Sequence, residues 1–253
     1  MQWSDEGLIL SVRAHGETAA IVELFTAQHG RCLGMVHGGR SRRLRPVLQI
    51  GNHVDATWKA RLTDQLGFFT VELRRGYAAQ SMSDPLSLTG LTSIAALARL
   101  LPERDPHPSL YEITQFVLSF LDDPSVWPAL YARWELALLQ EMGFGLDLSQ
   151  CAATGSNDQL IYVSPKSGRA VSASAGEPYR DKLLPLPAFL ANTGRGGQTG
   201  SQGSSMSPGV THRDITDALR LTGFFLESRV LTPRELAVPD ARTRLVELIG
   251  RVK

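Results

Sequence analysis

The chain has 253 residues, of which 43% are hydrophobic and 20% are charged, values that are ordinary for a soluble globular protein. This length allows one large domain or two modest ones, and either can bury a sizeable core. The formal net charge is only +1, which excludes a chain that attracts polyanions by its total charge. A nucleic-acid site therefore has to be sought in local charge.

The sequence carries no targeting or membrane-spanning pattern. It opens MQWSDEGLIL, without a basic segment leading into an apolar stretch, and no uninterrupted run approaches about 18 apolar residues. Its two cysteines, Cys32 and Cys151, lie far apart without metal-ligand partners at close spacing. They indicate neither a disulfide framework nor a zinc cluster. We expect a reduced, cytoplasmic protein with no membrane span and no cofactor.

Residues 1–80 are predicted to form an N-terminal domain of five short strands. The runs with strand character, most of them separated by glycine-containing turns, are 8–13, 18–26, 31–37, 53–62 and 69–73. The clearest alternation places on one face Val54, Ala56, Trp58, Ala60 and Leu62. Five short strands at this spacing favour a small closed or partly closed barrel, because closure removes exposed sheet edges.

Residues 84–253 are predicted to form a helical domain. Apolar spacing indicates helices over 86–101 and 109–120, the second opened by a capping box of Ser109 and Glu112. A third helix carries on one face Leu130, Trp134 and Leu138. Two further helices are expected to begin at Thr211 with Asp214, and at Thr232-Pro233 with Glu235, the last interrupted by Pro239.

Three segments between these helices have weaker patterns. Residues 146–180 are irregular, and 183–190 form a turn or a short helix. Residues 194–209 are dominated by Gly, Ser, Gln and Thr, which cannot bury enough apolar surface to become ordered. We therefore expect a mobile loop over 194–209.

The most informative local feature is a run of arginines between the third and fourth predicted strands. Over residues 40–61 six positive charges face the one negative charge of Asp55. The six cations are Arg40, Arg42, Arg43, Arg45, Lys59 and Arg61. Clustered arginines on a barrel offer a groove for a phosphate backbone, because a planar guanidinium can make two hydrogen bonds to one phosphate and can stack on bases. By composition alone, the same run is equally compatible with solvated surface.

The other candidate features favour structure over chemistry. Trp58 shares a face with Val54 and Leu62, which favours core packing over base stacking. The glycines at 194–200 resemble a nucleotide loop, but no strand precedes them and no Gly-Lys-Ser/Thr follows. The chain has no Gly-x-Ser-x-Gly elbow and no His-Glu-x-x-His pattern, and its six histidines are scattered. The sequence therefore predicts a protein that is not an enzyme.

An ordered set of short motifs resembles the RecO family over nearly the whole chain. The first motifs are 6–10, Arg13, Glu17, 21–26, Gly30 and, after the third strand, Gly38-Gly39-Arg40. The later motifs are 116–121, 134–139 up to Gly143, 184–187 and Ser228-Arg229. No single motif is decisive, but the ordered set is specific.

The resemblance implies an α+β protein, in which a five-stranded OB-fold barrel precedes an α-helical domain with a degenerate zinc-finger-like insertion. It implies binding of single- and double-stranded DNA, annealing of complementary strands, and help in loading recombinase onto gapped DNA at the nucleoid. The partners it implies are the ring-forming RecR protein and the acidic C-terminal tail of the single-stranded-DNA-binding protein.

The family's helical domain often carries a zinc site of two Cys-x-x-Cys pairs. Here Cys151 aligns with the first ligand, and the other three places hold Thr154, Ser172 and Ala175. A structural zinc site needs about four N, S or O ligands, so we expect the loop at 146–180 without the metal. Apolar packing would then hold it together, through Tyr162, Val163 and Val171.

For the acidic tail, the resemblance points to the helix around residues 131–138. Arg133 matches a basic position of the family's helix, where it could pair with a carboxylate. The neighbouring Tyr131 and Leu136 would receive a phenyl side chain. Taken alone, Arg133 is equally compatible with an arginine that is simply exposed to solvent on a helix and binds no partner.

Two other functions remain open from the sequence. One is an RNA-binding barrel protein, which would prefer RNA at equal length and salt. The other is a scaffold whose helical domain docks a partner while the barrel contacts DNA weakly. Partner binding that survives removal of the charges at 40–45 would mark the scaffold.

Overall fold

The computed structural model describes residues 1–62, 65–191 and 209–251. It divides into two compact units, Met1–Trp127 with Pro239–Leu245 and Pro128–Val238 with Val246–Lys253. Strands give way to helices near residue 76, and the division into an OB-fold domain over 1–80 and a helical domain over 84–253 stays a prediction. Apart from Gly209, the segment predicted as a mobile loop lies outside the described residues.

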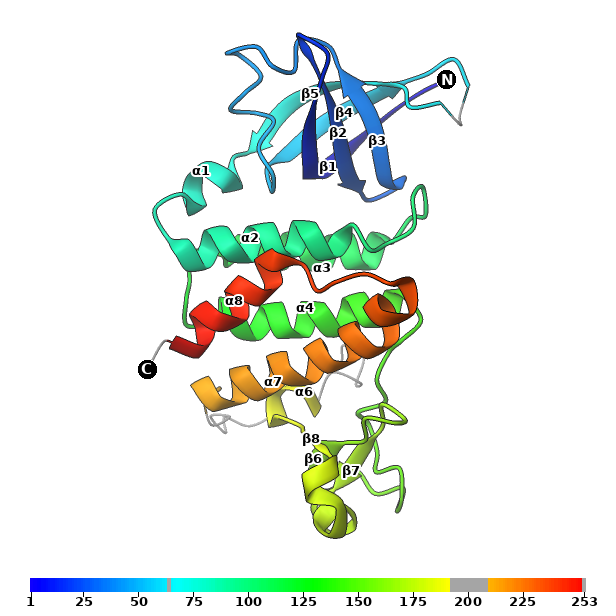
Figure 1. Cartoon of the computed structure of the whole chain (residues 1–253), viewed down its shortest axis with the longest axis vertical. Helices are drawn as coiled ribbons and strands as arrows, with labels where there is room; N and C mark the ends of the chain where they lie inside the picture. Colours follow the sequence, from blue (N-terminus) through cyan, green and yellow to red (C-terminus); the bar gives the residue numbers. More distant parts are fainter. Residues whose placement is uncertain (63–64, 192–208, 252–253) are drawn as a thin grey trace, which may run out of the picture. The chain divides into compact units, whose positions relative to one another are not determined.

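The first unit begins with a closed five-stranded barrel, drawn in blue to cyan in Figure 1. Its strands are β1 (Gln2–His15), β2 (Ala19–Thr26), β3 (Gly30–Val36), β4 (His53–Lys59) and β5 (Phe68–Arg75). The strand order is β1-β2-β3-β5-β4, and β1 pairs with both β2 and β4. Five strands closed in this order form an OB-fold barrel, which confirms the predicted fold class for this part.

The first strand is longer than predicted because it serves two neighbours. Its first half pairs with β4, from Gln2 opposite Lys59 to Leu8 opposite His53. Its second half pairs with β2, and the register shifts after Ile9, where a bulge bends the strand. Polar residues near the start of β1 therefore belong to the ladder although they lack a strand-like pattern.

The barrel core follows the alternation predicted for β4. Val54, Ala56 and Trp58 are buried, whereas Lys59 is exposed. From the other strands the core receives Ile9, Val22, Leu24, Val36, Phe69 and Val71. The prediction that Leu62 shares the buried face is wrong, because β4 ends at Lys59 and Leu62 is 60% exposed.

Three helices follow in the first unit: α1 (Tyr77–Ser81), α2 (Pro85–Ala98) and α3 (Pro108–Ser119). The Asp84 side chain caps α2 by accepting two backbone N–H bonds. The predicted capping box of Ser109 and Glu112 is wrong, because Pro108 is already the first residue of α3. Proline suits that position, where the missing N–H would have no partner within the helix.

The second unit combines helices with a small sheet. Its elements are α4 (Trp127–Glu141), β6 (Leu160–Val163), β7 (Ala170–Ser172), α5 (Ala173–Gly176), β8 (Leu184–Pro185), α6 (Ala188–Ala191) and α7 (His212–Phe225). Thr211 and Asp214 form the predicted capping box of α7. The helix start predicted at Thr232 is wrong: residues Thr232–Arg234 form one 3-10 turn, and α8 (Asp240–Arg251) begins after Pro239. The helix α8 spans the division between the two units.

A buried histidine links the barrel to α3 within the first unit. The Nε2 atom of His53 lies 2.9 Å from the Tyr111 hydroxyl and 3.4 Å from the Glu6 carboxylate. Burial lowers the pKa of His53 below its usual 6.5, although the charge of Glu6 acts in the opposite direction. The folded protein therefore favours the neutral imidazole.

We expect the protein to lose stability as the pH falls below 6.5, and His53→Gln to remove that loss. The unfolded chain takes up the proton first, so the contribution of His53 is complete above its unfolded pKa and is lost as pH falls through the folded pKa. Each unit by which folding lowers the pKa contributes about 1.4 kcal/mol to the free energy of unfolding. Urea unfolding across this pH range measures it, with exposed His15→Gln as the control. Equal pH dependence in wild type and His53→Gln would contradict the assignment.

Candidate nucleic-acid interface

The arginine segment, residues 40–45, lies in the connection between β3 and β4 and forms consecutive turns. The Arg45 N–H donates to the Ser41 carbonyl at 3.0 Å, and the Leu48 N–H donates to the Leu44 carbonyl at 2.8 Å. The side chains of Leu44 and Leu48 pack at the barrel core. The apolar side of the connection is thus anchored, and the arginines lie on its exposed side.

Arg40 has a structural role that the sequence did not reveal. Its Nη1 donates to the carbonyls of Gly16 and Glu17, at 2.9 and 3.0 Å, and its backbone N–H donates to the Thr18 carbonyl at 3.0 Å. Arg40 therefore fastens the turn between β1 and β2 to the arginine segment. The part of its guanidinium that makes these bonds is engaged before any ligand arrives.

The other predicted cations are exposed and form no ion pair with a carboxylate of the described residues. They are Arg42, Arg43, Arg45, Lys59 and Arg61. A surface cation without a carboxylate partner keeps its full charge for an external anion. Five such cations on one barrel give a local positive surface that the total charge of +1 conceals.

Lys59 and Arg61 lie at a shallow groove of about 410 Å³. Apolar side chains and the β4–β5 hairpin form the rest of its lining, which includes Met35, Gln65, Leu66 and Phe68. Lys59 is directly opposite Phe68 across the β4–β5 ladder, so both side chains point to the same face. The His37 ring stacks on Phe68 with the ring centres 4.6 Å apart and an angle of 15° between their planes.

The His37–Phe68 contact involves a residue that precedes the arginine segment and a residue that lines the groove of Lys59 and Arg61. His37 directly follows β3 and leads into the arginine segment, whereas Phe68 is the first residue of β5. Neither residue is among the sequence-predicted site residues. One signal was present, because Phe68 precedes the inward-facing Phe69 and a large apolar residue therefore falls on the solvent face of the strand.

The opposite end of the same outer face is acidic. Asp55 lies opposite Glu72 in the β4–β5 ladder, four residues along each strand from the opposed residues Lys59 and Phe68. Arg74 bonds the Asp55 carboxylate at 2.9 Å and the Glu6 carboxylate at 2.6 Å, so its charge is already balanced. The positively charged part of this outer face is therefore the end near the β4–β5 hairpin, where Lys59 lies.

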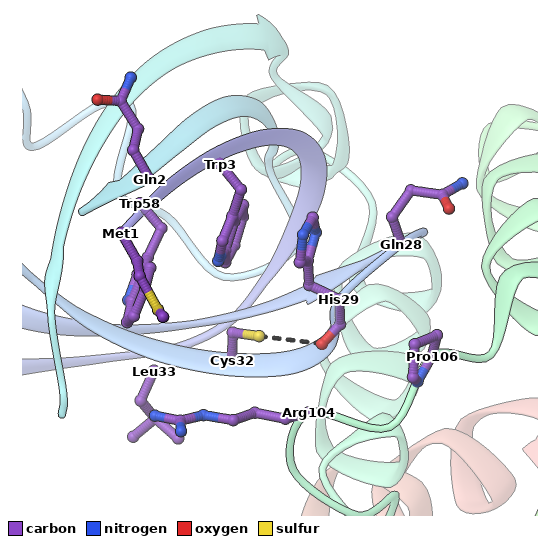
Figure 2. Close-up of a pocket in the computed structure, with 10 residues that line it drawn as sticks. All are labelled: Met1, Gln2, Trp3, Gln28, His29, Cys32, Leu33, Trp58, Arg104 and Pro106. Carbon is purple, nitrogen blue, oxygen red and sulfur yellow. Dashed lines mark hydrogen bonds between the residues drawn. The ribbon is translucent and has the colours of Figure 1, made fainter. Parts of the chain in front are cut away.

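A second hollow, of about 540 Å³, lies between the start of β1, β3 and the loop after α2 (Figure 2). Trp3 stacks between His29 and Trp58, with ring centres 3.9 and 5.7 Å apart. Trp58 is buried and donates from Nε1 to the Leu66 carbonyl, which confirms its predicted place in the core. Burial raises the pKa of the Cys32 thiol in this hollow to about 11, so it stays protonated at neutral pH.

The segment predicted as an irregular loop at 146–180 contains ordered structure. With β8 it forms a three-stranded sheet of order β7-β6-β8, in which Val163 and Val171 are buried as expected. Two of the aligned positions meet, since the Ser172 N–H donates to the Cys151 sulfur at 3.3 Å. Burial raises the pKa of Cys151, but hydrogen bonds from Ser172 and Thr154 lower it by a larger amount. The net result is a pKa of about 6.

This donor set does not fit a structural zinc ion. It offers one thiolate and two hydroxyl groups, and Ala175 has no donor atom where the fourth ligand would be. Within the described residues no three side chains of His, Cys, Asp or Glu come together as metal ligands. Cys151, Thr154, Ser172 and Ala175 alone therefore do not supply the four ligands of a structural zinc site.

The three residues of α4 that are predicted to receive an acidic tail differ in their exposure to solvent. Tyr131 is fully buried, and its hydroxyl donates to the Glu135 carboxylate at 3.0 Å; its contact with a partner stays a prediction. Arg133 is exposed; it donates to the Phe189 carbonyl at 2.7 Å and lies over the Phe189 ring. Leu136 is half-buried. Only Arg133 and Leu136 remain accessible.

In the described parts of the chain, no helix is both long and apolar enough to cross a bilayer. The closed barrel of strand order β1-β2-β3-β5-β4 places this protein in the class of OB-fold proteins. Two family models match the chain. Recombination protein O N terminal matches residues 1–77, and Recombination protein O C terminal matches residues 82–235.

The similarity to relatives extends over the full length. The chain is 57% identical to DNA repair protein RecO of Methylobacterium nodulans, with 98% of each chain covered. It is 54% identical to DNA repair protein RecO of Methylorubrum extorquens, again with 98% of each covered. It is 52% identical to DNA repair protein RecO of Rhodopseudomonas palustris, with 99% of this chain and 97% of the relative covered. The chain belongs to the RecO family of DNA repair proteins.

Proposed function

We propose that this protein is a recombination mediator without catalytic activity. It binds single- and double-stranded DNA on the barrel, anneals complementary strands and helps to load recombinase onto gapped DNA that single-stranded-DNA-binding protein coats. The observation that carries this proposal is the set of exposed cations without carboxylate partners in the described chain, on an OB-fold barrel of the RecO family. Acting on chromosomal DNA, it works in the cytoplasm at the nucleoid.

The mechanism is electrostatic. Arg42, Arg43 and Arg45 neutralise phosphates at the arginine segment, and Lys59 and Arg61 neutralise phosphates at the groove that Phe68 lines. Each neutralised phosphate releases condensed counterions, which makes binding favourable and strongly dependent on salt. Two strands with neutralised backbones repel each other less, so complementary bases can approach and pair.

Partner contacts complete the proposal. RecR and the acidic tail of the single-stranded-DNA-binding protein are the partners that family membership suggests. The exposed Arg133 offers a cation for a tail carboxylate, and Leu136 offers apolar surface beside it. The tail would bring the mediator to coated DNA, where the barrel engages the strand.

Strand annealing tests the proposed function. Complementary oligonucleotides are coated with the cognate single-stranded-DNA-binding protein, either intact or lacking its acidic tail, and duplex formation is followed by fluorescence. We expect this protein to accelerate annealing of strands coated with the intact protein, and to do so less on the tail-less coat. Binding of naked DNA without any annealing of coated strands would contradict the mediator. Tighter binding to RNA than to DNA of equal length would favour an RNA-binding barrel.

A further inference from the structure

One large aromatic side chain of the barrel faces solvent within the cationic surface. Phe68 is 42% exposed, although it stands in a strand whose neighbouring Phe69 is 3% exposed. His37 covers one face of the Phe68 ring, as their stacked geometry requires. A planar ring stacked on one side and still this exposed presents its remaining surface to solvent.

We propose that Phe68, backed by His37, is a stacking platform for an unpaired base of single-stranded DNA. Lys59 and Arg61 bind the phosphates beside that base. The inference rests on the proposed DNA binding and adds to it a contact that reads the presence of a base. A base in a duplex is stacked on its neighbours and cannot reach this ring, so the platform favours single strands over duplex DNA.

The barrel holds the platform rigidly. The Met35 N–H donates to the Gly67 carbonyl at 3.0 Å, which ties β3 to the start of β5 beside Phe68. Gly67 has a φ of +66°, and a Cβ there would lie 2.4 Å from the Trp58 ring, so only glycine lets the hairpin lie this close. A ring fixed in this way loses little conformational freedom when a base stacks on it.

The chemistry around the ring matches a nucleotide. The groove beside Phe68 has an apolar floor, with Met35 and Leu66, and two cations at its side. Among the residues that the structure describes, which leave out 63 and 64 of this hairpin, no aspartate or glutamate lines the groove. Nonspecific single-strand binding sites combine two parts: an apolar surface for the base and cations for the flanking phosphates.

Replacing Phe68 by leucine, together with an abasic DNA, tests the platform. Phe68→Leu keeps an apolar side chain and removes the ring. We expect it to weaken binding of an oligothymidine by about fivefold to hundredfold, the range for one stacked base. Duplex binding and the salt dependence should stay at wild-type values, because no cation changes. A backbone of the same length without bases should bind wild type and Phe68→Leu equally.

Matched controls separate this inference from the proposed function. Phe116→Leu removes an exposed ring of α3, 54% exposed, and should leave oligothymidine binding unchanged. Equal losses for Phe68→Leu on oligothymidine and on the abasic strand would overturn the platform, and so would a loss no larger than that of Phe116→Leu. In either case a steep salt dependence of wild-type binding would leave the proposed function intact. If the wild-type protein bound neither oligothymidine nor the abasic strand, both the stacking platform and the proposed function would be overturned.

Discussion

We expect Glu23→Gln to lower the free energy of unfolding by about 3–5 kcal/mol and the melting temperature by roughly 10 °C. Glu23 lies on β2 with its side chain only 2% exposed. Arg31 donates to one carboxylate oxygen, and Ser11 and Arg99 donate to the other at 2.8 Å. Glutamine cannot balance the charges of the half-buried Arg31 and the exposed Arg99, so the substitution removes the buried carboxylate that pairs with both guanidinium groups.

A second glutamate provides the control, because it faces the same arginine from solvent. Glu103 lies 3.8 Å from Arg31 and is 52% exposed, so Glu103→Gln should cost less than about 1 kcal/mol. Urea unfolding at neutral pH compares the two variants. A cost for Glu23→Gln no greater than that for Glu103→Gln would contradict the role of this cluster.

The effect of Glu23 should also depend on pH. Burial raises the pKa of Glu23, but hydrogen bonds from Arg31 and Ser11, with the charge of Arg99, lower it below 4.5 overall. A carboxylate whose folded pKa is lowered stabilises the protein above its unfolded pKa and stops doing so as pH falls through the folded value. The difference between wild type and Glu23→Gln should therefore narrow as the pH is lowered from 4.5.

The second large effect concerns DNA. We expect Arg42→Ala/Arg43→Ala to weaken binding to every DNA sequence and to flatten its salt dependence. If each arginine neutralises one phosphate, the slope of log K against log salt falls by about 1.4 for single strands and about 1.8 for duplex DNA. Fluorescence titrations of one oligonucleotide at several salt concentrations give that slope.

A paired arginine of the same barrel is the control for this double variant. Arg74→Ala removes a cation that is already bonded to Asp55 and Glu6, so the slope should not change. An unchanged slope in Arg42→Ala/Arg43→Ala would remove these residues from the interface. A slope reduced equally by Arg74→Ala would show that total charge, rather than this segment, governs binding.

The barrel could be predicted from sequence because its core follows a simple period. Alternation over β4 identified the buried Val54 and Trp58 correctly, since side chains on a strand point to opposite faces in turn. The start of β1 could not be predicted in this way, because pairing with β4 makes its polar residues a strand. The capping box at Ser109 failed because Pro108 sets the start of the helix more strongly than side-chain capping does.

The candidate site was only partly visible for a similar reason. Composition identified the arginines, but it could not show that Arg40 is engaged by the β1–β2 turn. The His37–Phe68 platform depends on strand register, which places Phe68 opposite Lys59 and beside the end of β3. The burial of Tyr131 could not be predicted, because a helix position alone does not show which face is buried.

Photo-crosslinking tests the central claim, DNA binding by the cationic surface of the barrel, most directly. A single-stranded oligonucleotide with a photoreactive thymidine analogue is bound to the full chain, irradiated and mapped by mass spectrometry of peptides. We predict crosslinks at His37 and Phe68 and in the peptides that contain the arginine segment, lost in the presence of high salt. Crosslinks confined to the helical region after residue 127, with none in the barrel, would contradict the account.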